Sequence, residues 1–306
     1  MKRTWIRIAL WSMAGLLVLF GALLIVLWAT SPSSPEIGRD ETPRDLPAEW
    51  LVKEPATVSS GVAPDVDGDA VEAAFEPFES QGRLALIGDG EAFGEEVYSL
   101  SIAEGGSELI SSGRFWFKVL VARIVIGFEQ TLTADARLRP GAYVMTFDGP
   151  LGFDRSMSAV FEGGRAMIER DDGSGEIVVS PDRAFVVGTF STYALVPRLF
   201  AEREQSGQAT LDLLFFGGPP SQDTENGATT GILPTIRITR AGRTRVLAGD
   251  AEIVVDRYLV LSGLGTNELF ARGDEFLAFR AIDEEEGTLL VYRSDYFPDG
   301  IEFVDD

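Results

Sequence analysis

EEVYSLSI, residues 95–102, shows the pattern that decides the fold class, because apolar and polar side chains alternate along it. Tyr98, Leu100 and Ile102 share one face, whereas Ser99 and Ser101 lie on the other. This period of two is typical of a β-strand with one face on a core and one in water. The pattern recurs in AYVMTF (142–147), PTIRITR (234–240), EFLAFRAI (275–282) and TLLVYRSD (288–295).

Glycine-containing turn signals separate these alternating segments at short intervals, as at Gly105-Gly106, Pro140-Gly141, Gly163-Gly164 and Ala241-Gly242. About ten to twelve strands fit between residues 80 and 298 at the usual spacing of such turns. No alternation of strands with helices is present, which disfavours a parallel sheet. The sequence therefore predicts a mainly β fold, a curved antiparallel sheet that forms either an open half-barrel or a sandwich.

RFWFKVLVARIVIGFEQTLTAD, residues 114–135, is dense in apolar side chains, and Arg123 interrupts it. Interpreted as one strand, it places Phe115 and Phe117 on one face, and Trp116, Leu120 and Ile124 on the other. Two alternatives explain a strand that is apolar on both faces. It is a central strand beneath a cover, or one of its faces lines an apolar ligand cleft.

GTFSTYALVPRLFAEREQSGQ, residues 188–208, breaks the alternation. Its spacing predicts a helix over 197–206 with an apolar lead-in over 190–196, because Pro197 suits a first helical turn and Gly207 suits a helix end. A helix this short needs support from the rest of the protein. We expect a single central helix that packs its apolar side chains on the curved sheet and closes one mouth of it.

A ligand site between this helix and the apolar strand is the first candidate for function. Its predicted lining is Phe117, Leu120, Ile124, Phe190, Tyr193, Leu195, Leu199 and Phe200. In the alternative interpretation the helix is merely part of the core. Replacing Leu199 and Phe200 with aspartate distinguishes the two, since a lid tolerates the change and a core does not.

The N-terminal residues 1–30 predict a cytoplasmic stub and a transmembrane anchor. Residues 8–29 carry no charge, and a helix of this length covers about 33 Å, enough for a hydrocarbon core of about 30 Å. Basic residues precede the segment and acidic residues follow it, so the positive-inside rule places the C-terminal part outside the cytoplasm. The alternative is a cleaved signal peptide, although its apolar region is usually shorter.

Residues 31–74 are rich in proline, acids and small residues, and they predict a disordered linker of about 35–40 Å. Residues 75–306 form the predicted extracytoplasmic β domain. We therefore expect a single-pass protein of a bacterial cytoplasmic membrane, with its N-terminus in the cytoplasm. Within the linker, DVDGDAVE (65–72) alternates acids as calcium loops do, but it lacks the EF-hand spacing, and an acidic turn is the favoured interpretation.

The composition excludes several classes of function. With 48 Asp and Glu against 26 Lys and Arg, the net charge is −22, which repels the phosphates of nucleic acids. The sequence has no cysteine and no histidine, which excludes thiolate and histidine chemistry, including Ser-His-Asp and Cys-His catalysis. We predict no cofactor, no metal and no catalytic residues, so that a non-enzymatic role is favoured and a carboxylate-based hydrolase is the remaining enzymatic alternative.

Three other segments bear polar groups without a diagnostic motif. Asp148 and Asp154 flank a Gly-Pro pair, where a turn is the favoured role over paired acid and base catalysis. Residues 217–231 indicate a surface loop between strands. The arginines at positions 237, 240, 243 and 245 are expected to pair with local acids, the alternative being a phosphate or carboxylate ligand.

The order of these segments resembles a known group of bacterial envelope proteins. GEEVYSL, the dense aromatic segment, PGAYVMTFDGP, a short central helix and GDEFLAFRAIDEEEGTLLVYRSD follow one another as in the LolA/LolB-like superfamily and its relatives of unknown function. The resemblance covers residues 80–298 and implies a curved half-barrel around a helical plug. The best-known members carry lipid-modified proteins in an apolar cavity, but no functional residue can be transferred to this chain.

The expected function is that of a membrane-anchored module that binds an apolar or lipid-like ligand. The alternative is a structural or assembly factor that engages another envelope protein. The predicted anchor argues against a shuttle, because a tethered protein cannot carry cargo far.

Overall fold

The computed structural model describes residues 77–119, 122–150, 154–171, 173–215, 235–249, 251–262, 265–283 and 287–304. The predicted anchor, the linker, Leu120 and the loop at 217–231 lie outside these residues. Within the described residues, no helix has both the length and the apolar character needed to cross a membrane.

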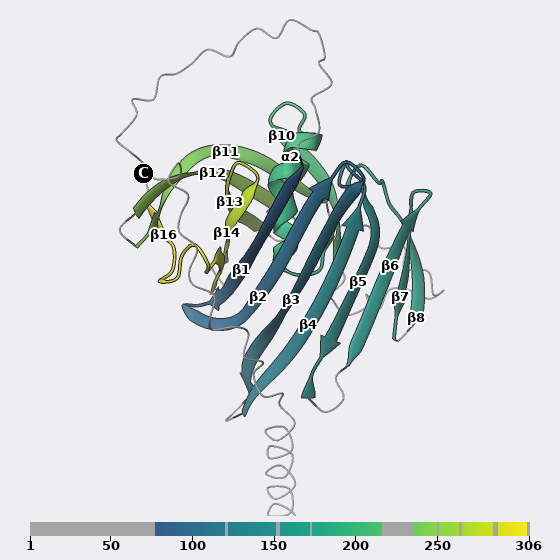
Figure 1. Cartoon of the computed structure of the whole chain (residues 1–306), viewed down its shortest axis with the longest axis horizontal. Coiled ribbons are helices and arrows are strands. Elements are labelled where there is room, and N and C mark those ends of the chain that lie inside the picture. Colours follow the sequence, from purple (N-terminus) through teal and green to yellow (C-terminus); the bar gives the residue numbers. More distant parts are fainter. Residues whose placement is uncertain are drawn as a thin grey trace, which may run out of the picture.

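The protein is built around one curved sheet of sixteen strands, which confirms the mainly β prediction (Figure 1). The hydrogen-bonded order runs β8-β7-β6-β5-β4-β3-β2-β1-β15-β14-β13-β12-β11-β10-β9, and β16 pairs with β11. The sheet is open, because its path ends at β8 on one side and at β9 on the other. The first half comprises β1 (Phe78–Gly88), β2 (Glu91–Ala103), β3 (Gly106–Val119), β4 (Ala122–Ala134), β5 (Pro140–Asp148), β6 (Arg155–Glu162), β7 (Arg165–Arg170) and β8 (Gly173–Val178).

The second half of the sheet contains the only parallel pair among the described strands, β9 and β10. Parallel neighbours require a crossover connection, and the predicted central helix lies in that connection. The elements are β9 (Ala184–Val187), the 3-10 helix η3 (Phe190–Leu195), α2 (Val196–Arg203), β10 (Gln208–Phe215), β11 (Thr235–Ala248), β12 (Ala251–Ser262), β13 (Gly265–Arg272), β14 (Glu275–Asp283), β15 (Gly287–Arg293) and β16 (Glu302–Val304).

The sequence prediction of ten to twelve strands is too low, and the segment 114–135 shows why. It is not one strand but a hairpin, in which β3 ends at Val119 and β4 begins at Ala122, paired with each other. The two residues between these strands, Leu120 and Val121, include no glycine, proline or asparagine, so that no turn signal in the sequence separates the strands. Phe117 and Ile124 therefore lie opposite each other on neighbouring strands.

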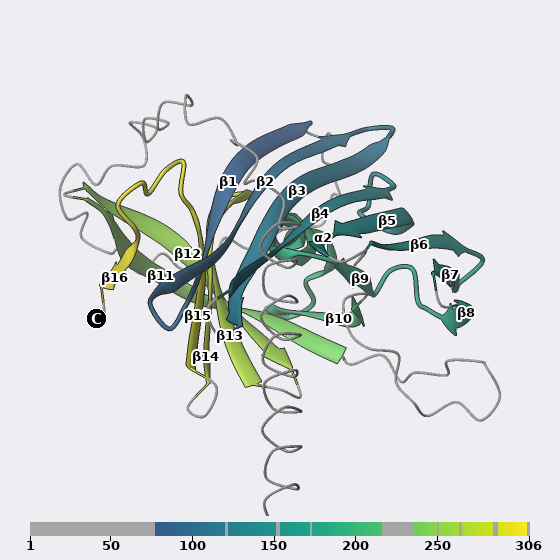
Figure 2. The same cartoon turned by 90° about the horizontal axis from the view of Figure 1, so that it is seen from below.

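The helix α2 lies in the hollow of the sheet, between the β1–β6 part and the β10–β15 part (Figure 2). Pro197 lies in its first turn as predicted, but the helix ends at Arg203 rather than at Ser206. The chain is already extended at Glu204, and the turn that brings Gln205 opposite Gln208 uses positive φ angles at Ser206 and Gly207. The Arg203 guanidinium donates hydrogen bonds to the carbonyl groups of Leu138 and Ala184, which fixes this end of α2.

Two apolar clusters stabilise the sheet. The larger one fills the concave side and combines side chains from β1–β7, η3, α2 and β9–β15. The smaller one lies on the other face of β11–β14, where the C-terminal segment covers it and Phe303 packs on Phe270 with ring centroids 4.5 Å apart. Because both of its faces are covered, β14 is apolar on both faces around Leu277 and Ala278.

A buried ionic cluster links β1 and β2 to β14 and β15 in the middle of the sheet. Arg293 of β15 is 0% exposed. Its guanidinium bonds to the carboxylates of Glu275 and Asp295, the latter at 2.7 Å, and donates to the Tyr98 hydroxyl at 3.0 Å. It also donates to the carbonyl oxygen of Gln81 at 2.9 Å and crosses Gly82 so closely that a Cβ there would overlap it. Glycine at position 82 is thus required by the arginine.

Candidate functional site

The concave face of β2–β4 carries a row of stacked phenylalanine rings, which we call the aromatic ladder. Phe93 and Phe115 stack with centroids 6.4 Å apart, and Phe115 and Phe128 with centroids 4.8 Å apart. All three pack against the large apolar cluster. Phe117 follows Phe115 on the same face of β3, since side chains alternate along a strand, and 46% of its surface is exposed. An accessible aromatic ring therefore lies next to the ladder along β3.

The plug formed by η3 and α2 faces the opposite wall of the sheet with its large side chains. Tyr193 packs on Phe279 of β14 with centroids 4.6 Å apart, and Phe200 meets Tyr258 of β12 edge-on at 5.2 Å. Leu195, Leu199 and Phe200 are buried. These contacts are those of core residues, and burial also raises the pKa of Tyr193 to about 12.

The structure divides the predicted lining residues into two groups. Phe190, Tyr193, Leu195, Leu199 and Phe200 lie in the plug, whereas Phe117 and Ile124 face each other near the far end of the β3–β4 hairpin. The start of η3 meets β3 at Ser111, and Phe117 lies about 20 Å further along the strand at 3.3 Å per residue. The plug and the end of the β3–β4 hairpin are therefore separate places, and Leu120 lies outside the described residues.

A buried polar network, not predicted from the sequence, connects the plug to the wall formed by β2–β5. The carboxyl group of Glu96 is 0% exposed and accepts hydrogen bonds from the Thr189 hydroxyl and the Ser191 amide. The side-chain amide nitrogen of Gln130 donates to the hydroxyl groups of Thr189 and Ser191. The side-chain oxygen of Gln130 accepts a hydrogen bond from the Tyr143 hydroxyl at 3.3 Å. This network fixes the point where the chain leaves β9 and enters η3.

Gly188 allows this close approach. A Cβ at this position would overlap the Tyr143 hydroxyl and the Gln130 side-chain oxygen, both of which are buried. Burial raises the pKa of Tyr143, and the nearby Glu96 carboxyl raises it further. The network thus depends on a glycine directly before its two central hydroxyl groups.

One sequence signal for Glu96 was available. Extending the alternation of EEVYSLSI backwards from Tyr98 by two residues places Glu96 on the buried face. The residues with which it pairs lie far away in the sequence, as Thr189 is 93 positions distant. The alternation could have identified a buried acid, but not its partners.

The pKa of Glu96 is raised above its ordinary value of 4.5, chiefly because burial disfavours the charged carboxylate, while hydrogen bonds from Ser191, Thr189 and Ser111 oppose the shift. The folded protein therefore holds a proton that the unfolded chain releases above pH 4.5. By linkage, this contribution to stability is complete below pH 4.5 and is lost as the pH rises through the folded-state pKa.

We expect Glu96→Gln to remove this loss, because glutamine offers a donor and an acceptor as the protonated acid does. The unfolding free energy of the variant relative to the original should rise from pH 4.5 toward the folded-state pKa, by about 1.4 kcal/mol for each step of one in pH. Urea unfolding at several pH values measures it. Glu108→Gln, at an exposed position on β3, is the control, and parallel curves for the two variants would contradict the assignment.

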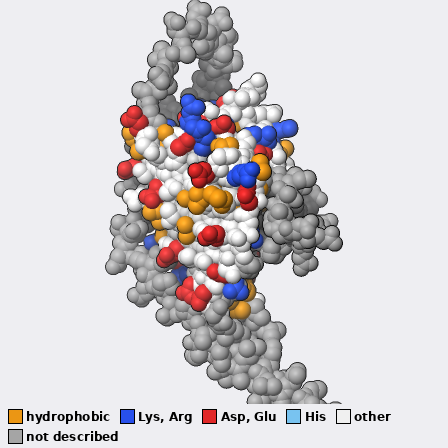
Figure 3. Space-filling view, turned by 90° about the vertical axis from the view of Figure 1, so that its right-hand side faces the viewer, with side chains coloured by type: hydrophobic (Ala, Val, Ile, Leu, Met, Phe, Trp, Pro, Cys, Tyr) orange, Lys and Arg blue, Asp and Glu red, His pale blue; other side chains and the backbone are white. Residues whose placement is uncertain are grey.

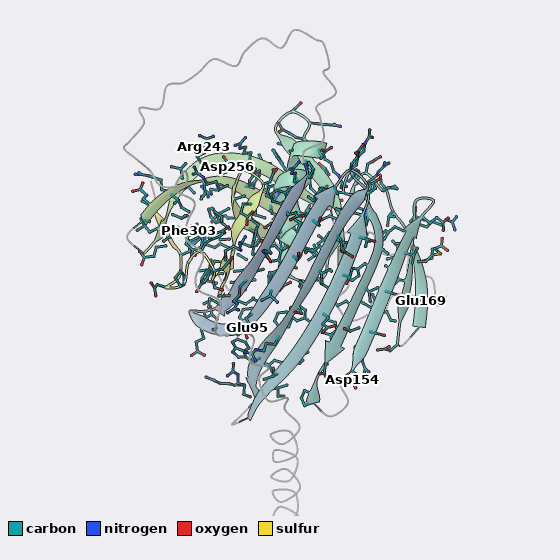
Figure 4. The ribbon with its side chains drawn as sticks, viewed as in Figure 1. Glu95, Asp154, Glu169, Arg243, Asp256 and Phe303 are labelled. Carbon is teal, nitrogen blue, oxygen red and sulfur yellow. The ribbon has the colours of Figure 1, made fainter. Side chains whose placement is uncertain are left out.

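The other polar candidates have ordinary surroundings. Arg240 and Arg243 pair with Asp256 at 2.6 and 3.4 Å, and Arg245 pairs with Glu252 at 3.0 Å, which confirms the expected local pairing for these three (Figure 4). Asp148 and Asp154 lie exposed where β5 ends and β6 begins. Among the described residues, no group of three or more acidic side chains is arranged to hold a metal ion.

The comparisons with known proteins give distant structural likenesses. No family model and no curated protein matches the chain. One similar solved structure is a β-barrel-like protein of the domain of unknown function DUF1849 from Brucella abortus, with a TM-score of 0.44 and 9% identity over 75% of this chain and 98% of that one. Another is a DUF1089 family protein from Pseudomonas aeruginosa, with a TM-score of 0.36 and 12% identity over 59% of this chain and 86% of that one. Neither description names LolA or LolB.

Proposed function

We propose that this chain is a membrane-anchored, extracytoplasmic β domain of a bacterial envelope, which binds an apolar or lipid-like ligand on its concave face without catalysing a reaction. One observation carries the proposal. Phe117, which follows Phe115 of the aromatic ladder on the same face of β3, is a ring that is 46% exposed. Burying an aromatic side chain is worth about 1.5–3 kcal/mol, so that an apolar ligand laid along this end of the ladder gains affinity there.

The location differs from the site expected from the sequence, which lay beneath the central helix. A ligand under the plug would have to displace Tyr193 from Phe279 and Phe200 from Tyr258. Such a displacement opens a packed core, and its cost is that of removing large side chains from a protein interior. A ligand that binds at Phe117 and Ile124, which are only partly buried, does not have to displace packed side chains.

The cellular location in this proposal rests on the sequence. The uncharged segment 8–29, the basic residues before it and the acidic residues after it support an anchor with the β domain outside the cytoplasm. A coil of about 35–40 Å over residues 31–74 would leave the domain free to turn toward the membrane or away from it.

Native mass spectrometry of the full chain, released from detergent, tests the ligand. We expect a retained apolar mass on the original protein and at least a tenfold loss of occupancy for Phe117→Asp, because a carboxylate at this point opposes an apolar ligand. Met167→Asp is the matched control, since Met167 is 44% exposed on β7. Equal retention in both variants, or no retained mass on the original protein, would reject the proposal.

A second candidate, an assembly factor that engages another envelope protein, is favoured by a different surface. Large apolar side chains on β3 and β5–β8 are exposed on the outer face: Ile110, Val144, Val160, Met167 and Val178. Val160 and Met167 face each other on neighbouring strands, and β8 is an edge strand. Figure 3, which views the molecule from the right-hand side of Figure 1, shows apolar side chains gathered between charged ones. Crosslinking from position 178 in membranes tests this alternative.

A further inference from the structure

The end of the β3–β4 hairpin extends past the strands beside it. β3 pairs with β2 only as far as Phe115, and β4 pairs with β5 only from Gly127 onward. Between these points, the two strands pair with each other alone, up to Val119 and Ala122. Figure 1 shows their ends at the lower edge of the sheet, beyond the turn between β1 and β2. We call residues 116–119 and 122–126 the hairpin end.

The hairpin end carries an aromatic side chain on each face, and its cationic side chains Lys118 and Arg123, which pair across the strands, lie on the face of Trp116. Phe117 lies on the concave face, and Trp116 lies on the opposite one. The Arg123 guanidinium is 4.4 Å from the centre of the Trp116 ring, and the indole N–H donates to the carbonyl oxygen of Ala92 at 2.7 Å. The Lys118 side chain is 78% exposed. Aromatic rings next to exposed cations are typical of surfaces at a membrane interface.

The charge of this segment is opposite to that of the whole chain. Residues 114–127 contain Arg114, Lys118 and Arg123 and no acid, whereas the chain has a net charge of −22. Two acids of β2 lie beside the segment, because Glu95 pairs with Arg114 and the exposed Glu91 lies 3.7 Å from Lys118. An exposed pair at that distance gives little stability. The ammonium group of Lys118 is thus available to an anionic surface.

We propose that the hairpin end docks on an anionic lipid surface. In this arrangement, Phe117 enters the boundary between headgroups and acyl chains, Trp116 lies at the headgroup level, and Lys118 and Arg123 contact lipid phosphates. The acidic remainder of the domain is repelled by the same surface, so that the hairpin end alone faces it. This docking requires no bound ligand, but it uses the same Phe117 ring as the proposed ligand site.

A labelling experiment on the full chain tests the docking, and the absence of cysteine makes single-site labelling direct. The variant Phe117→Cys is labelled with an environment-sensitive nitrobenzoxadiazole group and reconstituted in vesicles of phosphatidylcholine with phosphatidylglycerol. Met167→Cys, of nearly equal exposure, is the control. We expect quenching by doxyl-labelled lipid to be at least twofold greater at position 117. Equal quenching at the two positions would overturn the proposal.

Charge variants separate docking from simple apolar contact. In the Phe117→Cys background, Lys118→Glu with Arg123→Glu should lower quenching to the level of the control position, and Lys118→Gln with Arg123→Gln should lower it partly. Reversal of Arg165 and Arg243, which are exposed elsewhere, should leave it unchanged. In vesicles of phosphatidylcholine alone, quenching should be at the level of the control position for every variant. Quenching that changes neither with the charge variants nor with the charge of the lipid would overturn the proposal.

The same charge substitutions, made in the original protein with Phe117 retained, distinguish docking from ligand binding. Reversal of Lys118 and Arg123 leaves Phe117 and the aromatic ladder in place, so ligand retention in detergent should be unchanged. Loss of quenching with retained ligand supports docking as a separate property. Loss of retained ligand together with quenching would assign both effects to one apolar site and would overturn docking as an independent inference.

Discussion

Replacing Arg293 with alanine is expected to lower the free energy of unfolding by about 3–5 kcal/mol, because removing one member of a buried ion pair leaves the other uncompensated. The carboxylates of Glu275 and Asp295 would lose their common partner, and the Tyr98 hydroxyl and the Gln81 carbonyl would each lose a donor. Urea unfolding of the full chain, followed by circular dichroism, measures the loss.

The physical reason lies in the balance of charges around this guanidinium. Burial alone would lower the pKa of Arg293, but Tyr98, Asp295 and Glu275 raise it above its ordinary value, so that the arginine stays charged inside the protein. The charge is stable only while these neighbours surround it, and they in turn depend on it.

Two further variants make this prediction specific. Gly82→Ala should reproduce much of the loss without removing any charged group, since the new methyl group would overlap the guanidinium. Arg165→Ala is the matched control, because Arg165 pairs with Glu176 on the surface and should cost no more than about 1 kcal/mol. A similar loss for Arg293→Ala and Arg165→Ala would contradict the structural role of the buried cluster.

The double variant Leu199→Asp with Phe200→Asp is expected to prevent folding of the β domain. Both side chains are buried in the large apolar cluster, and an unpaired carboxylate in such a place costs several kcal/mol. Two of them together approach the whole stability of an ordinary domain, about 5–15 kcal/mol. The expected result is loss of protease resistance and of the β-sheet circular dichroism signal.

Ala201→Asp is the control for this experiment, because Ala201 lies in the same helix directly after Phe200 but is exposed. It should leave the domain folded. Phe200→Ala gives a graded measurement, with an expected loss of about 3–5 kcal/mol from the cavity next to Tyr258. If the double variant folded normally, the plug would be a lid over the sheet rather than part of its core.

The local character of the fold was predictable from residue spacing. The alternation in EEVYSLSI becomes β2, with Tyr98, Leu100 and Ile102 buried as expected. Pro197 and the spacing of Leu195, Leu199 and Phe200 indicate the plug helix, although its end lies at Arg203, before the expected Ser206. These features depend on contacts within a few residues, which the sequence displays directly.

The errors have a common cause, which is that pairing between strands is not local. In 114–135, no turn residue separates Val119 from Ala122, so that the sequence predicted one strand where the structure has the β3–β4 hairpin. The two strands joined through the plug, β9 and β10, are parallel, although the glycine turns elsewhere indicated antiparallel neighbours. The predicted lining residues fall into two groups for the same reason, since Phe117 lies at the end of the β3–β4 hairpin and Phe200 lies in the plug.

The sequence by itself determined that this protein is mainly β, that one short helix interrupts it, and that thiol and histidine chemistry are impossible, because periodicity and composition are properties of the chain alone. The tertiary structure decided what is buried and with which partner. Glu96 meets Thr189 across 93 positions and Arg293 meets Tyr98 across 195. Such contacts form only when distant segments pack together, and their energy depends on the burial that this packing creates.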